Sequence, residues 1–152
     1  RFSKWQYSAG AVIALFHDTI ITLGVFSALH GILPFSMEVD QAFIAAILTV
    51  IGYSINDTVV VFDRIREMMG IYVKRSRHEV INKAINNTLS RTTLTSLTTL
   101  FVVIVLFLFG GSSIKGFSFA ILFGITIGTY SSIFVASPLM SDLLKKDEVT
   151  KS

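Results

Sequence analysis

The chain has 152 residues, of which 52% are hydrophobic and 15% are charged, and its mean hydropathy is +0.68. A soluble domain of this size could not hide so much apolar surface, because small globular proteins still expose much of their area. The lack of cysteine excludes disulfides and thiolate metal sites, and His17, His30 and His78 lack the spacing of metal ligands, so we expect no metal site. The net charge of +3 does not indicate nucleic-acid binding, because the basic residues lie at the ends of apolar segments.

Four segments are long and apolar enough to cross a bilayer as helices, which takes about 20 residues each. They cover residues 8–30, 41–62, 88–109 and 116–140. The links at 31–40 and 110–115 are short and rich in Gly, Pro or Ser, as tight connections are. The sequence therefore predicts an all-α membrane protein, a bundle of four transmembrane helices. Because the chain begins with Arg1 and has no signal-peptide layout, we expect it to be a fragment of a longer polypeptide.

Lysine and arginine are distributed unevenly between the two ends of these spans. Of the 13 such residues, 12 lie near the termini or in and beside the central link at 64–87, and only Lys115 lies on the other side. Short loops rich in Lys and Arg stay in the cytoplasm. Both termini and the central link are therefore predicted to be cytoplasmic, with Glu38 and Asp40 outside.

The central link is itself expected to contain a helix. Residues 76–79, Ser-Arg-His-Glu, have the pattern of a capping box, in which a serine and a glutamate satisfy free backbone donors at a helix start. Apolar residues then recur at helical spacing, at Val80, Ile81, Ala84 and Ile85. We expect a short cytoplasmic amphipathic helix; the alternative is an N-terminal extension of the third span.

Three charged residues fall inside the predicted spans, where a charge at the bilayer centre costs about 2.5–3.5 kcal/mol. Asp18, next to His17, lies roughly 15 Å into the first span, and Asp57 lies roughly 10 Å from the cytoplasmic boundary of the second. Arg91 lies at the cytoplasmic end of the third span. Such residues are functional candidates by default.

Asp57 and Arg91 are predicted at similar depths on adjacent antiparallel helices, so their side chains can meet. Beside Arg91, hydroxyls recur every three or four residues, at Thr88, Thr92, Thr95 and Thr99. An acid, a base and a row of hydroxyls are what a hydrated proton path needs.

Each of these residues also has a structural alternative. Arg91 can extend to the headgroups, and Asp57 can form a static interhelical hydrogen bond. Asp18 can be a polar anchor with His17. The threonines can bond their own backbone and leave no wet path.

Small residues recur every four positions along the fourth span, at Gly116, Ala120, Gly124, Gly128, Ser132 and Ala136. Such a ridge lets helix backbones approach closely. We expect the ridge to pack within this chain; a homodimer interface is the alternative.

Residues 52–67, GYSINDTVVVFDRIRE, resemble the signature of the SecF family of protein-export membrane proteins. Further blocks of that family are similar in the same order: AGAVIALFHDTIITLG (9–24), SRTTLTSLTTL (90–100), LFGG (108–111) and GTYSSIFVASPL (128–139). The match covers nearly the whole chain. It implies the C-terminal half of a SecF protein, within the resistance–nodulation–division superfamily.

In that superfamily an acidic pair in the first of these segments relays protons. Here Asn56 precedes Asp57 in place of a second acid, which leaves Asp57 as the titrating member. The resemblance implies that Asp57 and Arg91 form the coupling pair, with Asn56, Asp18 and Thr95 as further members. It implies protons or sodium ions as the coupling ion, no other cofactor, and residence in the bacterial cytoplasmic membrane.

The function implied is assistance of polypeptide export, driven by the proton motive force. The implied partners are SecD, the Sec channel, the translocating polypeptide and membrane lipid. The chain has no P-loop and no nucleophile–base arrangement, so we expect neither ATP use nor enzyme activity. The alternatives are a small-molecule exporter of the same superfamily and a structural subunit that holds SecD in place. The sequence identifies no substrate-binding residues.

The orientation can be tested by cysteine labelling. Because the basic residues gather on one side, cysteines at Ser36 and Ser112 should react with an impermeant reagent from the periplasm. A cysteine at Ser76 should react only after the membrane is opened. Periplasmic labelling at position 76 would contradict the predicted orientation.

Overall fold

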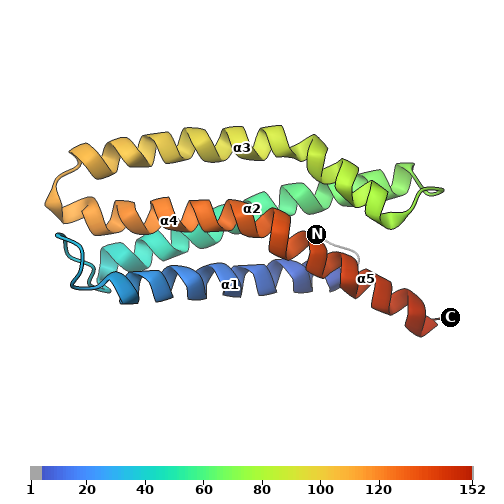
Figure 1. Ribbon diagram of the computed structural model, residues 1–152, viewed down its shortest axis with the longest axis horizontal. Coiled ribbons are helices and arrows are strands. Elements are labelled where there is room, and N and C mark those ends of the chain that lie inside the picture. The colour runs from blue at the N-terminus through green and yellow to red at the C-terminus, as the bar shows by residue number, and fades with distance from the viewer. Residues whose placement is uncertain (1–4, 152) are drawn as a thin grey trace.

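Residues 5–151 are described by a computed structural model, in which four long helical rods lie side by side (Figure 1). The last rod is interrupted by a short π-helical stretch, called here the π segment. In chain order the elements are α1 (Trp5–Leu29), α2 (Gln41–Ile71), α3 (Arg77–Phe109), a 3-10 turn (Ser112–Ile114), α4 (Lys115–Ser131), the π segment (Ser132–Ala136) and α5 (Ser137–Lys151).

All four rods are long and apolar enough to cross a membrane, the fourth over Ser112–Leu144. The prediction of an all-α, four-span bundle is therefore confirmed. The orientation of the bundle in the membrane stays a prediction. The end that holds the start of α1, the turn between α2 and α3, and α5 is called the basic end below.

Local signals fix where the helices begin and turn. The carboxylate of Asp40 caps α2 by accepting a hydrogen bond from the amide of Phe43 at 2.8 Å. The hydroxyl of Ser76 caps α3 by accepting from the amide of Glu79 at 3.4 Å, at the position where the capping pattern predicted a helix start. Gly111, in the link before α4, has a φ of +79°, which an L side chain rarely adopts.

The helices at the basic end are longer than the predicted spans. We expected residues 64–87 to link the second and third spans, but only residues 72–76 lie outside the helices. The segment after Ser76 is the first part of α3, with no break before the third span, as in the alternative considered. The reason is that hydropathy marks where a helix leaves the lipid, whereas helical hydrogen bonding continues into water wherever packing supports it.

Two apolar clusters occupy the two ends of the bundle, and a polar band lies between them. The cluster at the basic end includes Phe62, Ile65, Ala84, Ala136 and Met140. The cluster at the opposite end includes Phe26, Phe43, Ala46, Ala120 and Ile125. The buried polar side chains between them include Asp18, Ser54, Asp57, Thr58, Thr92, Ser96 and Ser132. Many large apolar side chains are exposed on the outside, as lipid contact requires.

The ridge of small residues packs α4 against α2. A Cβ atom at Gly124 would overlap the side chain of Val50, and one at Gly128 would lie 3.2 Å from the Cβ of Ser54. Further along the same rod, Gly10 of α1 meets Ala136 and Met140. The ridge therefore serves packing within the chain, as expected from its spacing.

Gly124→Ala should destabilise the bundle by about 1–3 kcal/mol, because the new methyl group must displace the stiff side chain of Val50. Thermal unfolding in detergent, followed by circular dichroism, measures the effect. Gly24→Ala is the matched control, because a Cβ at Gly24 meets no atom within 4 Å. Equal melting temperatures for the two variants would show that the α2–α4 contact tolerates separation.

Candidate functional site

The middle of α2 turns three polar side chains toward its neighbours. Ser54, Asp57 and Thr58 are only 2%, 8% and 1% exposed, and their three- and four-residue spacing places them on one face of the helix. Asn56 is exposed, because adjacent residues of an α-helix differ by about 100° in direction. The Asn56-Asp57 pair therefore does not act as a unit: the acid faces the bundle and the amide does not.

The carboxylate of Asp57 lies close to both α3 and the π segment. The hydroxyls of Ser132 and Thr92 adjoin it, and the charge of Arg91 is near enough to act on it. Within the described residues, Asp57 Oδ2 and Thr92 Oγ1, both buried, have no partner that meets the distance and angle of a full hydrogen bond, so these polar contacts are weak ones. Such a carboxylate can accept a proton, a cation or a new hydrogen bond without first breaking an existing one.

Ser132 continues the small-residue ridge of α4 by one turn and is the first residue of the π segment. Its hydroxyl donates to the carbonyl of Gly128 at 2.9 Å and lies 3.0 Å from the hydroxyl of Thr58. One turn later, the hydroxyl of Ser137 donates to the carbonyl of Ser132 at 2.9 Å and satisfies it across the wider turn. Short π-helical stretches inside α-helices frequently lie at functional sites. Here the irregular turn adjoins the buried acid.

Arg91 does not pair with Asp57 in this structure. Its side chain is exposed, and within the described residues no ion pair joins its guanidinium to a carboxylate. Instead it lines a cavity of about 490 Å³ between α2 and α3, whose polar walls include Asn56, Asp63, Arg64, Glu67 and Thr88. The two helices bring Asp57 and Arg91 near each other, and direct pairing stays a prediction.

Asp18 belongs to a separate cluster between α1 and α2. Its carboxylate accepts a hydrogen bond from the hydroxyl of Ser54 at 2.5 Å and lies 3.0 Å from Nδ1 of His17. Its carbonyl accepts from the hydroxyl of Thr22 at 2.8 Å. Asp18 is thus a bonded interhelical anchor, one helical turn of α2 away from Asp57; a role in coupling stays a prediction.

The threonine row on α3 is mostly bonded to its own helix. Thr95 is exposed and donates to the carbonyl of Arg91 at 2.8 Å. Thr88 and Thr99 likewise donate to carbonyls one turn back. Thr92, the member beside Asp57, is the exception. The row is therefore not a continuous chain of free hydroxyls.

Sequence reasoning missed the partners that the other helices supply. Ser54 bonds Asp18, and Ser132 adjoins Asp57. A third link joins α2, α3 and α4, because Ser96 lies 3.0 Å from the hydroxyl of Tyr53 and 2.7 Å from that of Thr129. The available signal was weak: Ser54 stands three residues before Asp57, and Ser132 interrupts the glycine and alanine ridge.

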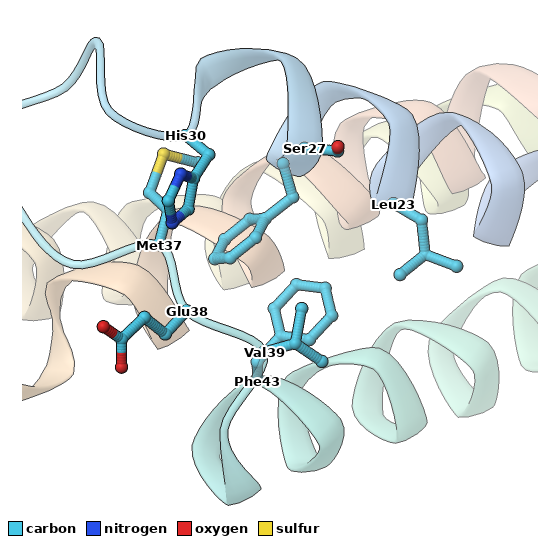
Figure 2. Close-up of a pocket in the computed structure, with 8 residues that line it drawn as sticks. Leu23, Ser27, His30, Met37, Glu38, Val39 and Phe43 are labelled. Atoms are coloured by element: carbon cyan, nitrogen blue, oxygen red, sulfur yellow. The ribbon is translucent and has the colours of Figure 1, made fainter.

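A larger cavity, of about 540 Å³, lies at the opposite end of the bundle (Figure 2). Its apolar wall includes Phe26 and Phe43, whose rings lie 4.2 Å apart. Figure 2 shows that Glu38 turns its carboxylate away from these rings. The cavity contains no member of the polar band, so the candidate site is the one around Asp57.

Residues 1–146 match the family described as "Protein export membrane protein SecD/SecF, C-terminal". The chain belongs to the SecD/SecF family. The protein translocase subunit SecF of Rhodothermus marinus is 64% identical over 140 residues, which are 92% of this chain and 46% of that protein. The resemblance in the motif blocks is confirmed, and the matched part is the C-terminal region of SecF.

Solved structures agree with this assignment. A crystal structure of SecDF in a super-membrane-facing form has a TM-score of 0.84 and 43% identity, and it covers 97% of this chain. Another, of SecDF from Thermus thermophilus, described as a translocon-associated membrane protein, has a TM-score of 0.82 and 44% identity over 93% of this chain. The chain spans about a fifth of each SecDF structure and less than half of the SecF relative. It is a multi-pass protein of the bacterial inner membrane.

Ser54→Ala should destabilise the bundle by about 1–3 kcal/mol, because it leaves the buried carboxylate of Asp18 without its donor from α2. Thermal unfolding of the purified protein measures the loss. Thr126→Val is the control, because the exposed Thr126 bonds only its own helix. A Ser54 variant as stable as the control would show that this hydrogen bond does not hold α1 to α2.

Proposed function

We propose that this chain is the membrane part of a Sec accessory subunit that works with SecD. In this proposal the subunit uses an ion gradient to promote polypeptide export through the Sec channel. Support for the export role comes from SecF relatives named as translocase subunits and from SecDF structures, one described as translocon-associated. Support for ion coupling comes from the site itself.

The observation that carries the proposal is the state of Asp57. It is an almost fully buried acid inside a membrane span, with one oxygen unbonded and two hydroxyls and an arginine nearby. A buried acid that served packing alone would have its bonds completed, as Asp18 has. Ionisable groups inside spans commonly mark ion pathways.

The geometry suggests two arrangements of α2 and α3. In one, Asp57 is neutral and Arg91 turns to the polar cavity, as its position in this structure allows. In the other, Asp57 is charged and Arg91 moves to it, because an unpaired charge in a low dielectric is costly. Alternation between two packings is the bistable element that an ion-coupled transporter requires. Protons and sodium ions can both drive such a cycle.

In this proposal the cavity between α2 and α3, whose lining stops short of Asp57, is the polar path between the acid and the basic end. Its walls hold acids and bases, with Asp63 and Glu67 nearer the end of α2 and Arg91 and Asn56 deeper in. Arg64 is held by Glu67 at 2.7 Å, which leaves Arg91 as the cation next to the site. The basic end is the predicted cytoplasmic side, so an ion that moves down its gradient from the periplasm reaches Asp57 first and then leaves past Arg91.

Asp57→Asn should remove the stimulation of export by an ion gradient and leave ATP-driven export unchanged, because the amide cannot take up the charge. Asp57→Glu should retain part of the stimulation. Arg91→Lys should be impaired less than Arg91→Ala, because it keeps the charge but loses the planar fork. The assay is export into inverted vesicles that contain the full-length subunit and SecD, with and without a gradient.

Three controls make the result specific. Asp142→Asn changes an exposed acid outside the site and should keep full stimulation. Co-purification of SecD with the Asp57 variant separates coupling from scaffolding, since a scaffold role predicts normal export once the complex forms. If Asp57 and Arg91 act as a pair, the double variant should lose no more than the worse single variant. Gradient stimulation at the wild-type level in Asp57→Asn would refute the proposal.

A further inference from the structure

The turn between α2 and α3 gathers positive charge around one aromatic ring. Tyr72 ends α2, and its carbonyl accepts a hydrogen bond from the amide of Arg75 at 3.1 Å. Lys83, on α3, places its Nζ 3.0 Å from the Tyr72 hydroxyl and 4.4 Å from the ring centroid. The guanidinium of Arg75 lies 5.4 Å from the same centroid. Two cations are thus held on one phenol by cation–π contact.

The nearest acid along α3, Glu79, lies one turn before Lys83 and forms no ion pair with it. Lys74, Arg75 and Lys83 form no ion pair within the part of the chain that the structure describes. The pKa of Tyr72 is lowered, first by its hydrogen bond from Lys83 and then by the charge of that residue, and Arg75 and Arg64 act in the same direction. The ring therefore lies in a positive field.

The depth of the cluster follows from the ends of the predicted spans. The second span ends at residue 62 and the third begins at residue 88. Tyr72 follows the end of the second span by ten residues, and Lys83 precedes the start of the third by five. At about 1.5 Å per residue, the backbone of Tyr72 lies roughly 15 Å outside the hydrocarbon and that of Lys83 roughly 8 Å.

That depth places the Lys83 side of the cluster next to the lipid headgroups. Trp5 is exposed on the outside of α1, and tryptophan favours the boundary between hydrocarbon and headgroups. The headgroup layer is about 5–8 Å thick on each side of the hydrocarbon core. The ammonium of Lys83, which reaches the Tyr72 hydroxyl, therefore lies at the outer edge of the headgroup layer.

We propose that Tyr72, Arg75 and Lys83 form a binding site for the headgroup of an anionic phospholipid at the basic end. Arg75 can hold two phosphate oxygens with its planar fork, and Lys83 adds a point charge. The contacts with Tyr72 hold both cations in place before the lipid arrives, so binding orders little side chain. The uncompensated charge favours a lipid with net negative charge over a zwitterionic one, whose own cation is repelled.

A protein partner is the main rival occupant. Ile71 and Val73 are exposed beside the cluster and offer a small apolar surface. Two side chains are far less than a stable protein interface needs, whereas the charge and the depth both match a lipid headgroup. Charge complementarity therefore favours a lipid headgroup over a protein partner.

The test uses the full-length subunit with Val73→Cys as its only reactive cysteine. This exposed position in the turn between α2 and α3 carries a fluorophore. The protein is reconstituted in phosphatidylcholine vesicles that contain increasing mole fractions of a phosphatidylglycerol with a nitroxide-bearing headgroup. Quenching of the fluorophore reports lipid at the site. Nitroxide-bearing phosphatidylcholine is the comparison lipid.

Quenching by the anionic lipid should saturate at a lower mole fraction than quenching by the zwitterionic one. Arg75→Gln and Lys83→Gln should each raise the mole fraction for half quenching about fivefold, and Lys83→Arg should restore most of the loss. Lys115→Gln, at the opposite end, should have no effect.

Equal quenching by the two lipids would overturn the proposal. The proposal would also be overturned if Arg75→Gln, Lys83→Gln and Lys83→Arg all bound the anionic lipid like the wild type. Displacement of the lipid by millimolar soluble glycerol phosphate would show a site for free anions instead. A preference for the anionic lipid that appears only when SecD or the Sec channel is added would assign the turn between α2 and α3 to a protein partner.

Discussion

The close approach of α4 to α2 at Gly124 and Gly128 is the contact on which the rest of the bundle depends. In lipid the hydrophobic effect does not draw helices together, so association rests on van der Waals contact and interhelical hydrogen bonds. The two glycines leave no Cβ between the backbones, and Val50 and Ser54 fill the space. Because α4 is this close, the next turn along it brings the hydroxyl of Ser132 to Thr58 and to Asp57.

The interior is organised by the cost of burying polar groups away from water. Most of the hydroxyls avoid that cost locally, by bonding a carbonyl one turn back on their own helix, as Thr22, Thr88 and Thr129 do. A few bond across helices and fix how the helices are rotated. Among the buried oxygens without a partner in the described residues, which include those of Ser118 and Ser131, Asp57 Oδ2 and Thr92 Oγ1 lie together at one place. Because the hydrogen bonds around Asp57 and Thr92 are incomplete, this part of the polar band is weakly held. We place the function there.

The π segment divides the fourth rod into two parts with different partners. Before it, α4 packs on α2 through Gly124 and Gly128; at its end and after it, Ala136 and Met140 pack on α1 at Gly10. The join between the two parts is therefore next to Asp57. A change in the charge of this acid acts on the turn that connects the two packing surfaces, which gives a local event a path to the whole bundle.

The sequence alone determined the features that depend on composition and short-range order. Apolar length fixed the four spans, and Ser76 and Glu79 marked the start of α3. Charged side chains are costly in lipid, and for this reason the sequence pointed to Asp57, Arg91 and Asp18. Recurring small residues identified the packing face of the fourth span, and five motif blocks identified the family.

Only the tertiary structure decided which side chains meet. It separated Asn56 from Asp57, bonded Ser54 to Asp18, turned Arg91 toward a cavity and produced the π segment beside the acid. A pattern along one helix shows which residues share a face, but it does not show how far that face is rotated or how closely the next helix approaches. Those two quantities come from contacts between residues far apart in the chain, and here a glycine ridge and a few hydroxyls set them.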